Sequence, residues 1–173
     1  MPGRTKAPAV AIYSSQHALR VPRRKLGDLI AFVARAEGAR IDEVDVAVVG
    51  AAKMAALNRR YLRRAGPTDV LSFDLSRDED AALSAEIVVC GDLAVREAAK
   101  RRWGRQRELM LYVVHGLLHL LGYDDDTAAS AERMHAREEE LLEAFAARSR
   151  RRTASAQRRA AQPATRRPSP GER

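Results

Sequence analysis

The sequence predicts an α+β fold in which a mixed four-stranded sheet is covered by helices. Two observations support this class. Strand-like apolar patterns occur only in the first 90 residues, and helical patterns alone occupy residues 92–147. In addition, the helix predicted for residues 106–121 is apolar on nearly all sides from Leu109 onward, which indicates a central buried helix.

The sheet is predicted from four short segments, namely residues 9–13, 43–49, 68–74 and 85–90. The second of these alternates acidic residues with valine, the pattern of a half-buried strand. Helices are predicted for residues 22–37, 51–64, 92–102, 106–121 and 128–147. The first of them opens at Pro22 and is followed by Gly38, as helices commonly are.

The net charge of +8 is concentrated at the C-terminal end of the chain. Residues 148–173 hold nine of the 31 basic residues and one of the 23 acidic residues, so residues 1–147 carry 22 of each. We expect a folded domain at 1–147 and a disordered Arg-rich tail at 148–173, because the tail has too few apolar residues to join a core. Arginines in such a tail are expected to bind RNA non-specifically.

The protein is expected to be soluble and cytoplasmic. Its only cysteine is Cys90, which excludes an intrachain disulfide and a thiolate-rich zinc site. No apolar run approaches the roughly 20 residues that a membrane helix needs. The apolar stretch Ala7–Tyr13 is too short for a signal peptide.

The segment HGLLHLLGYDDD, residues 115–126, carries the strongest chemical signal. His115 and His119 are four residues apart on a helix, so their imidazoles project from one face and can share an ion. Gly122 ends the helix, and Asp125 follows on a turn that can return a carboxylate to the imidazoles. Two nitrogens and one oxygen suit Zn²⁺, and the fourth position is left for water, as in a catalytic site. We therefore predict one Zn²⁺ per chain.

A structural role for each histidine is the simpler alternative. Two histidines on a nearly apolar helix would each need a buried partner, which favours a shared metal ion. The spacing H-x3-H-x2-G-x2-D also matches metzincin peptidases. A zinc metallopeptidase needs a glutamate directly after the first histidine as general base, and Gly116 occupies that position. The sequence therefore disfavours peptidase chemistry.

The same segment resembles the signature of a known family. The stretch HGLLHLLGYD at 115–124 is similar to the signature of the YbeY family of bacterial rRNA-maturation factors. A second stretch, LNRRYLRRAGPTDVLSFD at 57–74, is similar to the family's LNxxYR…PTDVLSF block. A third, AEIVVC at 85–90, is similar to its G-D/E-I-V-I strand. These matches fall within about residues 43–145. The resemblance implies a single-strand-specific, metal-dependent endoribonuclease acting in rRNA maturation (16S rRNA 3′ end processing) and ribosome quality control, with single-stranded rRNA and the ribosome or a ribosomal subunit as partners.

The chain departs from the family pattern at two positions. Asp125 stands where members typically have a third histidine, and metzincins show that aspartate can fill such a position. Leu62 stands where members have an arginine thought to help bind or cleave RNA. Arg63 and Arg64 next to it, and Arg59 on the preceding helix, are the candidates for binding phosphates.

The resemblance and the residues together predict hydrolysis by a zinc-bound water. The sequence does not identify the general base, for which Asp124, Asp126 and the 2′-hydroxyl of the RNA are alternatives. A non-catalytic ribosome-assembly factor, in which the zinc is structural, is the main alternative function.

Overall fold

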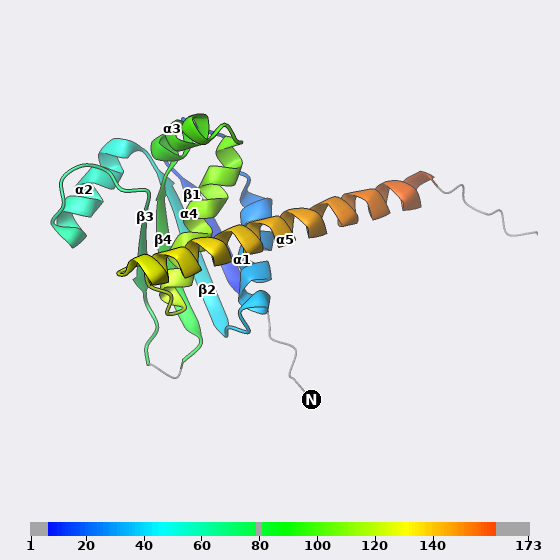
Figure 1. Cartoon of the computed structure of the whole chain (residues 1–173), viewed down its shortest axis with the longest axis horizontal. Helices are drawn as coiled ribbons and strands as arrows, with labels where there is room; N and C mark the ends of the chain where they lie inside the picture. The colour runs from blue at the N-terminus through cyan, green and yellow to red at the C-terminus, as the bar shows by residue number, and fades with distance from the viewer. Residues whose placement is uncertain (1–6, 79–80, 162–173) are drawn as a thin grey trace, which may run out of the picture.

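The computed structural model describes residues 7–78 and 81–161. In this part of the chain it contains four strands and five helices: β1 (Ala9–Ser14), α1 (Arg23–Ala36), β2 (Ile41–Val49), α2 (Ala51–Leu62), β3 (Val70–Asp74), β4 (Leu83–Cys90), α3 (Gly91–Arg101), α4 (Arg105–Leu120) and α5 (Ala128–Ala161) (Figure 1). The strands and the first four helices agree with the predicted segments to within a few residues at their ends.

The four strands form one sheet in the order β1-β2-β4-β3. β1, β2 and β4 are parallel, and β3 pairs antiparallel with β4, with Val70 opposite Val89. The central strands β2 and β4 are rich in buried valine, because strands covered by helices need apolar residues on their faces. The prediction of an α+β fold with a mixed four-stranded sheet is confirmed.

The helix α4 lies in the middle of the molecule. It contacts β3 and β4 on one side and α5 on the other, while α1 packs beside it (Figure 1). Its fully buried side chains include Leu109, Val113 and Leu117. The nearly apolar sequence of this helix from Leu109 onward therefore reflects contacts on several sides, as the sequence predicted.

The end of α4 is fixed by Gly122, which has a positive φ of 93°. The N–H of Gly122 donates to the carbonyl of His119 at 3.0 Å, and the N–H of Tyr123 donates to the carbonyl of Leu118 at 3.0 Å. These two bonds form a Schellman motif, which ends the helix and satisfies its last carbonyls. The chain then reverses, and a new helix begins after Thr127, whose hydroxyl accepts from the N–H of Ser130 at 3.1 Å.

The last helix is much longer than predicted. It was expected to end at Ala147, but it continues to Ala161, and its second half projects from the body of the protein (Figure 1). The prediction of disorder is therefore wrong for residues 148–161, while residues 162–173 lie outside the described residues. The extension is rich in arginine and alanine, which favour helix and prolong one already started by packing. A lack of apolar anchors keeps this segment out of the core without unfolding it.

No helix within the described ranges is long and apolar enough to cross a membrane.

Candidate metal centre

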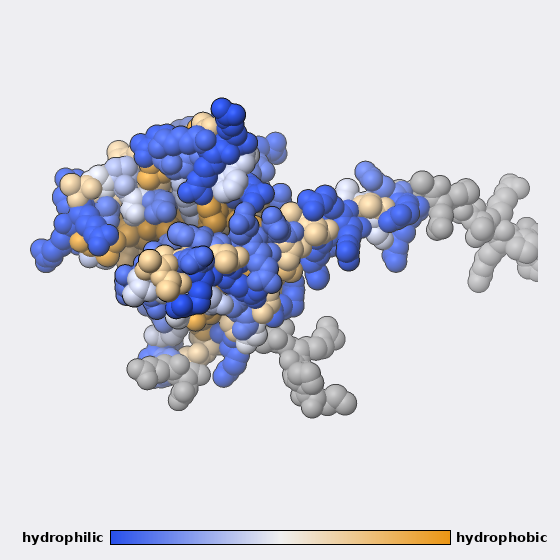
Figure 2. Space-filling model, viewed as in Figure 1, coloured by the Kyte–Doolittle hydropathy of each residue, from blue (hydrophilic) through white to orange (hydrophobic). Residues whose placement is uncertain are grey.

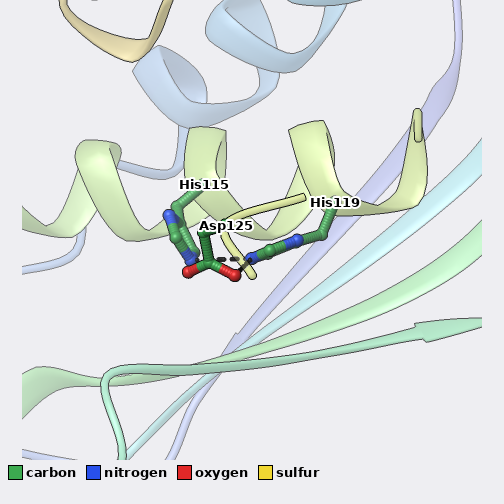
Figure 3. Close-up of side chains that lie close together, drawn as sticks. All are labelled: His115, His119 and Asp125. Carbon is green, nitrogen blue, oxygen red and sulfur yellow. Dashed lines mark hydrogen bonds and ion pairs between the residues drawn. The ribbon is translucent and has the colours of Figure 1, made fainter. Parts of the chain in front are cut away.

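The three predicted ligands meet at the end of α4. His115 and His119 project from the same face of this helix, and Asp125 comes back from the following turn to meet them (Figure 3). One ligand atom from each residue lies within 4.8 Å of the other two. The two Nε2 atoms are 3.0 Å apart, and the Nε2 of His119 lies 3.8 Å from the Oδ1 of Asp125. In tetrahedral zinc sites, neighbouring ligand atoms are about 3.3–3.6 Å apart, so these side chains fit one ion.

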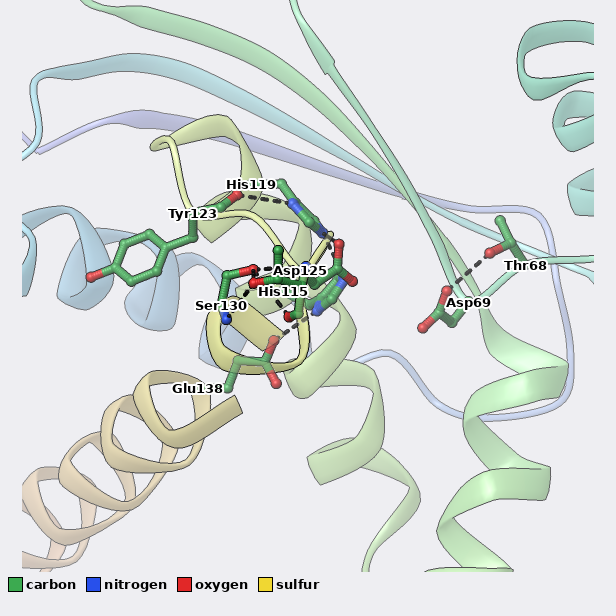
Figure 4. A network of polar contacts seen from close by, with 9 residues as sticks. Thr68, Asp69, His115, His119, Tyr123, Asp125, Ser130 and Glu138 are labelled. Atoms are coloured by element: carbon green, nitrogen blue, oxygen red, sulfur yellow. Dashed lines mark hydrogen bonds and ion pairs between the residues drawn. The ribbon is translucent and has the colours of Figure 1, made fainter. Parts of the chain in front are cut away.

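Both imidazoles have their second nitrogen held by another group. The Nδ1 of His115 lies 2.7 Å from the Oε1 of Glu138 on α5, and the Nδ1 of His119 lies 3.1 Å from the carbonyl oxygen of Tyr123 (Figure 4). Because both partners are acceptors, each Nδ1 carries the proton and each Nε2 turns a lone pair toward the other. Two lone pairs facing each other at 3.0 Å repel unless a cation lies between them. This arrangement is characteristic of imidazoles oriented to bind a metal.

The electrostatic surroundings of His115 favour positive charge. Burial lowers its pKa, but the hydrogen bond to Glu138 and the charges of Glu138, Asp69 and Asp125 together outweigh burial, so the pKa is raised above its ordinary value. The same negative groups that attract a proton also attract a metal cation. A proton and a metal ion therefore compete for this imidazole.

Hydrogen bonds connect the turn after α4 to the C-terminal end of α1. The hydroxyl of Tyr123 donates to Glu37 at 2.9 Å, and the guanidinium of Arg137 donates from Nε to the other oxygen of Glu37 at 2.8 Å. Glu37 follows the last residue of α1, and Arg137 lies on α5 next to Glu138. One network thus joins α1, the turn and α5, and it fixes the backbone carbonyl that orients His119.

Gly116, between the two histidines, faces the sheet at close range. A Cβ built on it would lie 2.9 Å from Cγ2 of Val70 and 3.2 Å from Cγ2 of Ile87. A glutamate at this position would have to displace β3 or β4. The position that carries the general base in metzincin peptidases is therefore packed against strands, with no space for a carboxylate over the metal site.

The predicted phosphate-binding arginines lie apart from this cluster. Arg59 is on the last turn of α2, Arg63 ends that helix with a φ of 54°, and Arg64 follows; all three are exposed. Within the described ranges none of them forms an ion pair. Leu62, where the family has arginine, is 50% exposed. The structure therefore does not bring these side chains into the cluster of ligands.

Three groups at the site were missed by sequence reasoning. They are the Glu138 carboxylate, the Tyr123 carbonyl and Asp69, which lies just before β3, on the strand side of the imidazoles, and acts on His115 through its charge (Figure 4). Glu138 is 23 residues from His115 and reaches it only because α5 packs on α4. The buried position of a glutamate on α5, next to Leu141 and Leu142 in the apolar pattern, was the available signal.

Comparisons with known proteins identify the family. The family model described as Endoribonuclease YbeY matches residues 12–146. The chain belongs to the YbeY family. The Endoribonuclease YbeY of Anaeromyxobacter sp. (strain Fw109-5) is 38% identical over 137 residues, covering 76% of this chain and 69% of that protein. The one of Moorella thermoacetica is 41% identical over 128 residues, covering 68% and 82%.

The fold is also found in a solved structure. The solution structure of TM1509 from Thermotoga maritima aligns with a TM-score of 0.57 at 24% sequence identity and covers 91% of this chain and 99% of its own. The family model and the relatives confirm the resemblance inferred from the sequence motifs, and with it the assignment as a YbeY endoribonuclease. The family match ends at residue 146, so the second half of α5 lies beyond it.

Proposed function

We propose that the protein cleaves single-stranded rRNA during maturation of ribosomal subunits in the cytoplasm, and that it does so with one Zn²⁺ bound by His115, His119 and Asp125. The observation that supports this best is the convergence of the two Nε2 atoms, each set by an acceptor on its Nδ1. The family supports a metal-dependent endoribonuclease that acts in rRNA processing. We propose zinc as the metal because two imidazoles and one carboxylate suit this ion.

The side chains provide an open site for this chemistry. Zn²⁺ bound to three protein ligands would polarise a phosphoryl oxygen and make a coordinated water more acidic. Asp125 is 45% exposed on its side chain and His119 30%, so substrate can approach from the solvent side. Glu138 is only 5% exposed and holds His115 from within the protein.

The surroundings of Asp124 make this carboxylate a weaker candidate for the general base. The hydrogen bond from Ser130, with smaller contributions from the N–H of Asp126 and from Arg133, holds the pKa of Asp124 below its ordinary value. A carboxylate with a lowered pKa is a weaker base. Among the carboxylates, Asp126 is therefore the better candidate. The 2′-hydroxyl of the RNA would act as the nucleophile in place of water and would itself need a base to accept its proton. Arg59, Arg63 and Arg64 are the residues we propose to contact the phosphates on the α2 side.

The test is metal analysis followed by RNA cleavage. Protein purified without chelator is expected to contain one zinc per chain and to cut single-stranded RNA but not duplex RNA. Chelation should abolish cleavage, and zinc should restore it. His119→Ala should lose both metal and activity, while His135→Ala, at an exposed histidine on α5, should keep both. Zinc-free protein that cuts RNA at the full rate would contradict the proposal.

The same preparation separates an enzyme from an assembly factor with a structural zinc. The core is large and continuous within the described residues, so we expect the metal-free protein to stay folded, with helical circular dichroism retained. Unfolding on chelation, with no cleavage by the metal-loaded protein, would favour the structural role. Peptidase activity is not expected, because Gly116 leaves no space for its general base.

A further inference from the structure

A basic groove lies far from the metal ligands, between the beginning of α1 and the projecting half of α5. Its volume is about 850 Å³. Its walls carry five basic side chains and one acidic side chain: Arg20, Arg23, Arg24, Lys25, Arg152 and Asp28. The groove therefore has a formal charge of +4 within a space large enough for part of a polymer.

The basic side chains of the groove outnumber its single carboxylate and are not paired within the described residues. None of the five cations forms an ion pair there, and all of them are exposed. The N-terminus of α1 opens beside them, and its first turn contains no acidic residue and no side-chain cap. The positive end of the helix dipole thus adds to the five side chains. Such a surface attracts an anion with several charges.

The chain's own ends do not fit this groove. Residues 162–173 contain three arginines and one glutamate, and residues 1–6 contain Arg4 and Lys6. Both ends are basic in sequence, so their charge does not complement that of the groove. A separate polyanion complements it better.

The distance from the groove to the metal centre follows from the rise per residue along α5 and α1, which both run between the two places. Arg152 is 14 residues beyond Glu138 on α5, or about 21 Å along the axis, and Lys25 is 12 residues before Glu37, or about 18 Å. Glu138 touches His115, and Glu37 touches Tyr123 beside His119. An RNA strand of about six stacked nucleotides spans this distance.

We propose that this groove binds the sugar-phosphate backbone of the substrate RNA several nucleotides away from the cut. The proposal rests on the proposed function and adds a second contact surface to it. Ser149, Arg152, Thr153 and Ala156 on one wall lie beyond residue 146, where the family match ends. The mainly hydrophilic surface of the projecting helix is visible in Figure 2.

The test compares two variants that lose the same charge. The groove variant is Arg20→Gln/Arg24→Gln/Arg152→Gln, and the control is Arg40→Gln/Arg77→Gln/Arg102→Gln, three exposed arginines outside the groove. Binding of fluorescent single-stranded RNA is measured by anisotropy against salt in metal-free protein. For an RNA of about 20 nucleotides, three lost phosphate contacts should reduce the slope of log K against log salt by about 2 and weaken binding at least about tenfold at low salt.

An RNA of about 4 nucleotides cannot reach both places, so the zinc-loaded groove variant should cleave it at low RNA concentration as fast as the control does, while it cleaves the long RNA more slowly. Equal slopes for groove and control variants with the long RNA would overturn the proposal, as would equal losses of cleavage rate for long and short RNA. Binding to phosphatidylserine vesicles with no groove-dependent RNA binding would also overturn it. The binding assay does not depend on cleavage. A wild-type protein that binds through the groove but cuts no RNA would contradict the proposed function alone.

Discussion

The two histidines differ in what holds them in place. His115 faces a buried carboxylate at 2.7 Å, whereas His119 faces a backbone carbonyl at 3.1 Å. A charged acceptor strengthens an imidazole as a ligand more than a neutral one does, and it also stabilises the protonated form. The Glu138 side chain should therefore control both the strength of metal binding and its pH dependence.

Replacing Glu138 should weaken metal binding without changing the ligands. Glu138→Ala is expected to reduce zinc affinity about 10–100-fold, because the imidazole loses its orienting acceptor. Glu138→Gln should fall between this variant and wild type, since the amide oxygen can accept the hydrogen bond but carries no charge. Affinity is measured by competition with a chromophoric chelator. Glu139→Ala, an exposed neighbour, is the control, and equal affinity of the two alanine variants would contradict the assignment.

The raised pKa of His115 determines how zinc affinity changes with pH. Zinc binds the neutral imidazole, so its affinity should fall as the pH decreases through this pKa, and the fall should begin above the ordinary histidine value of about 6.5. In the metal-free protein the sign is opposite. A pKa raised above its unfolded value adds stability at low pH, which is lost as the pH rises through the folded pKa.

Zinc titrations at a series of pH values check this prediction, with Glu138→Gln as the comparison. Loss of the carboxylate removes the largest influence that raises the pKa. The decline in affinity should therefore move to lower pH in this variant. An unchanged midpoint would show that Glu138 does not govern the proton on His115.

Prediction from the sequence of which side chains converge succeeded where local geometry decides the contact. The i,i+4 spacing places His115 and His119 on one helical face, and the glycine turn returns Asp125 to them. It failed for Glu138 and Asp69, whose approach depends on how α5 and β3 pack on α4. A contact across 23 or more residues leaves no periodic trace in the sequence.

At the scale of the elements, two helical glycines have opposite surroundings. Gly116 on α4 is pressed against Val70 and Ile87, whereas a Cβ on Gly27 in α1 would meet nothing within 4 Å. Alanine gains about 1 kcal/mol of helix propensity over glycine in either helix. At Gly116 a clash with short branched side chains on strands costs about 1–3 kcal/mol and outweighs the gain.

Gly27→Ala should therefore raise the free energy of unfolding by about 1 kcal/mol, and Gly116→Ala should lower it. Chemical denaturation followed by circular dichroism measures both. Gly27→Ala serves as the control for propensity, since it adds the same methyl group without a clash. A Gly116→Ala variant at least as stable as Gly27→Ala would show that α4 does not pack this closely on the sheet.

The elements themselves were predicted well because their patterns are local. Alternation in β2 and the apolar surface of α4 follow directly from burial. The end of α5 was wrong because composition was used to infer disorder, although arginine and alanine favour helix once packing has started one. The lack of apolar residues after Ala147 predicts that this segment does not pack in the core. It does not predict that the segment is disordered.

At the scale of the whole molecule, charge and chemistry are separated along the chain. Residues 1–147 have no net charge and contain every residue of the metal cluster, whereas residues 148–173 carry the entire excess of +8. Nine arginines beside a neutral domain should act mainly on the affinity for a polyanion and on its dependence on salt.

Truncation after Ala147 should therefore weaken RNA binding and flatten its salt dependence while leaving the cleavage rate at saturating RNA unchanged. A second truncation, after Ala161, removes three arginines and one glutamate, so it lowers the net charge by only 2 and keeps Arg152 and the helical extension. If the extension supplies the contacts, most of the loss should appear only in the shorter protein. Unchanged affinity and salt slope after the first truncation would refute an RNA role for residues 148–173. Loss of cleavage at saturation would instead assign part of the active site to them, because the metal ligands and Glu138 remain intact in both proteins.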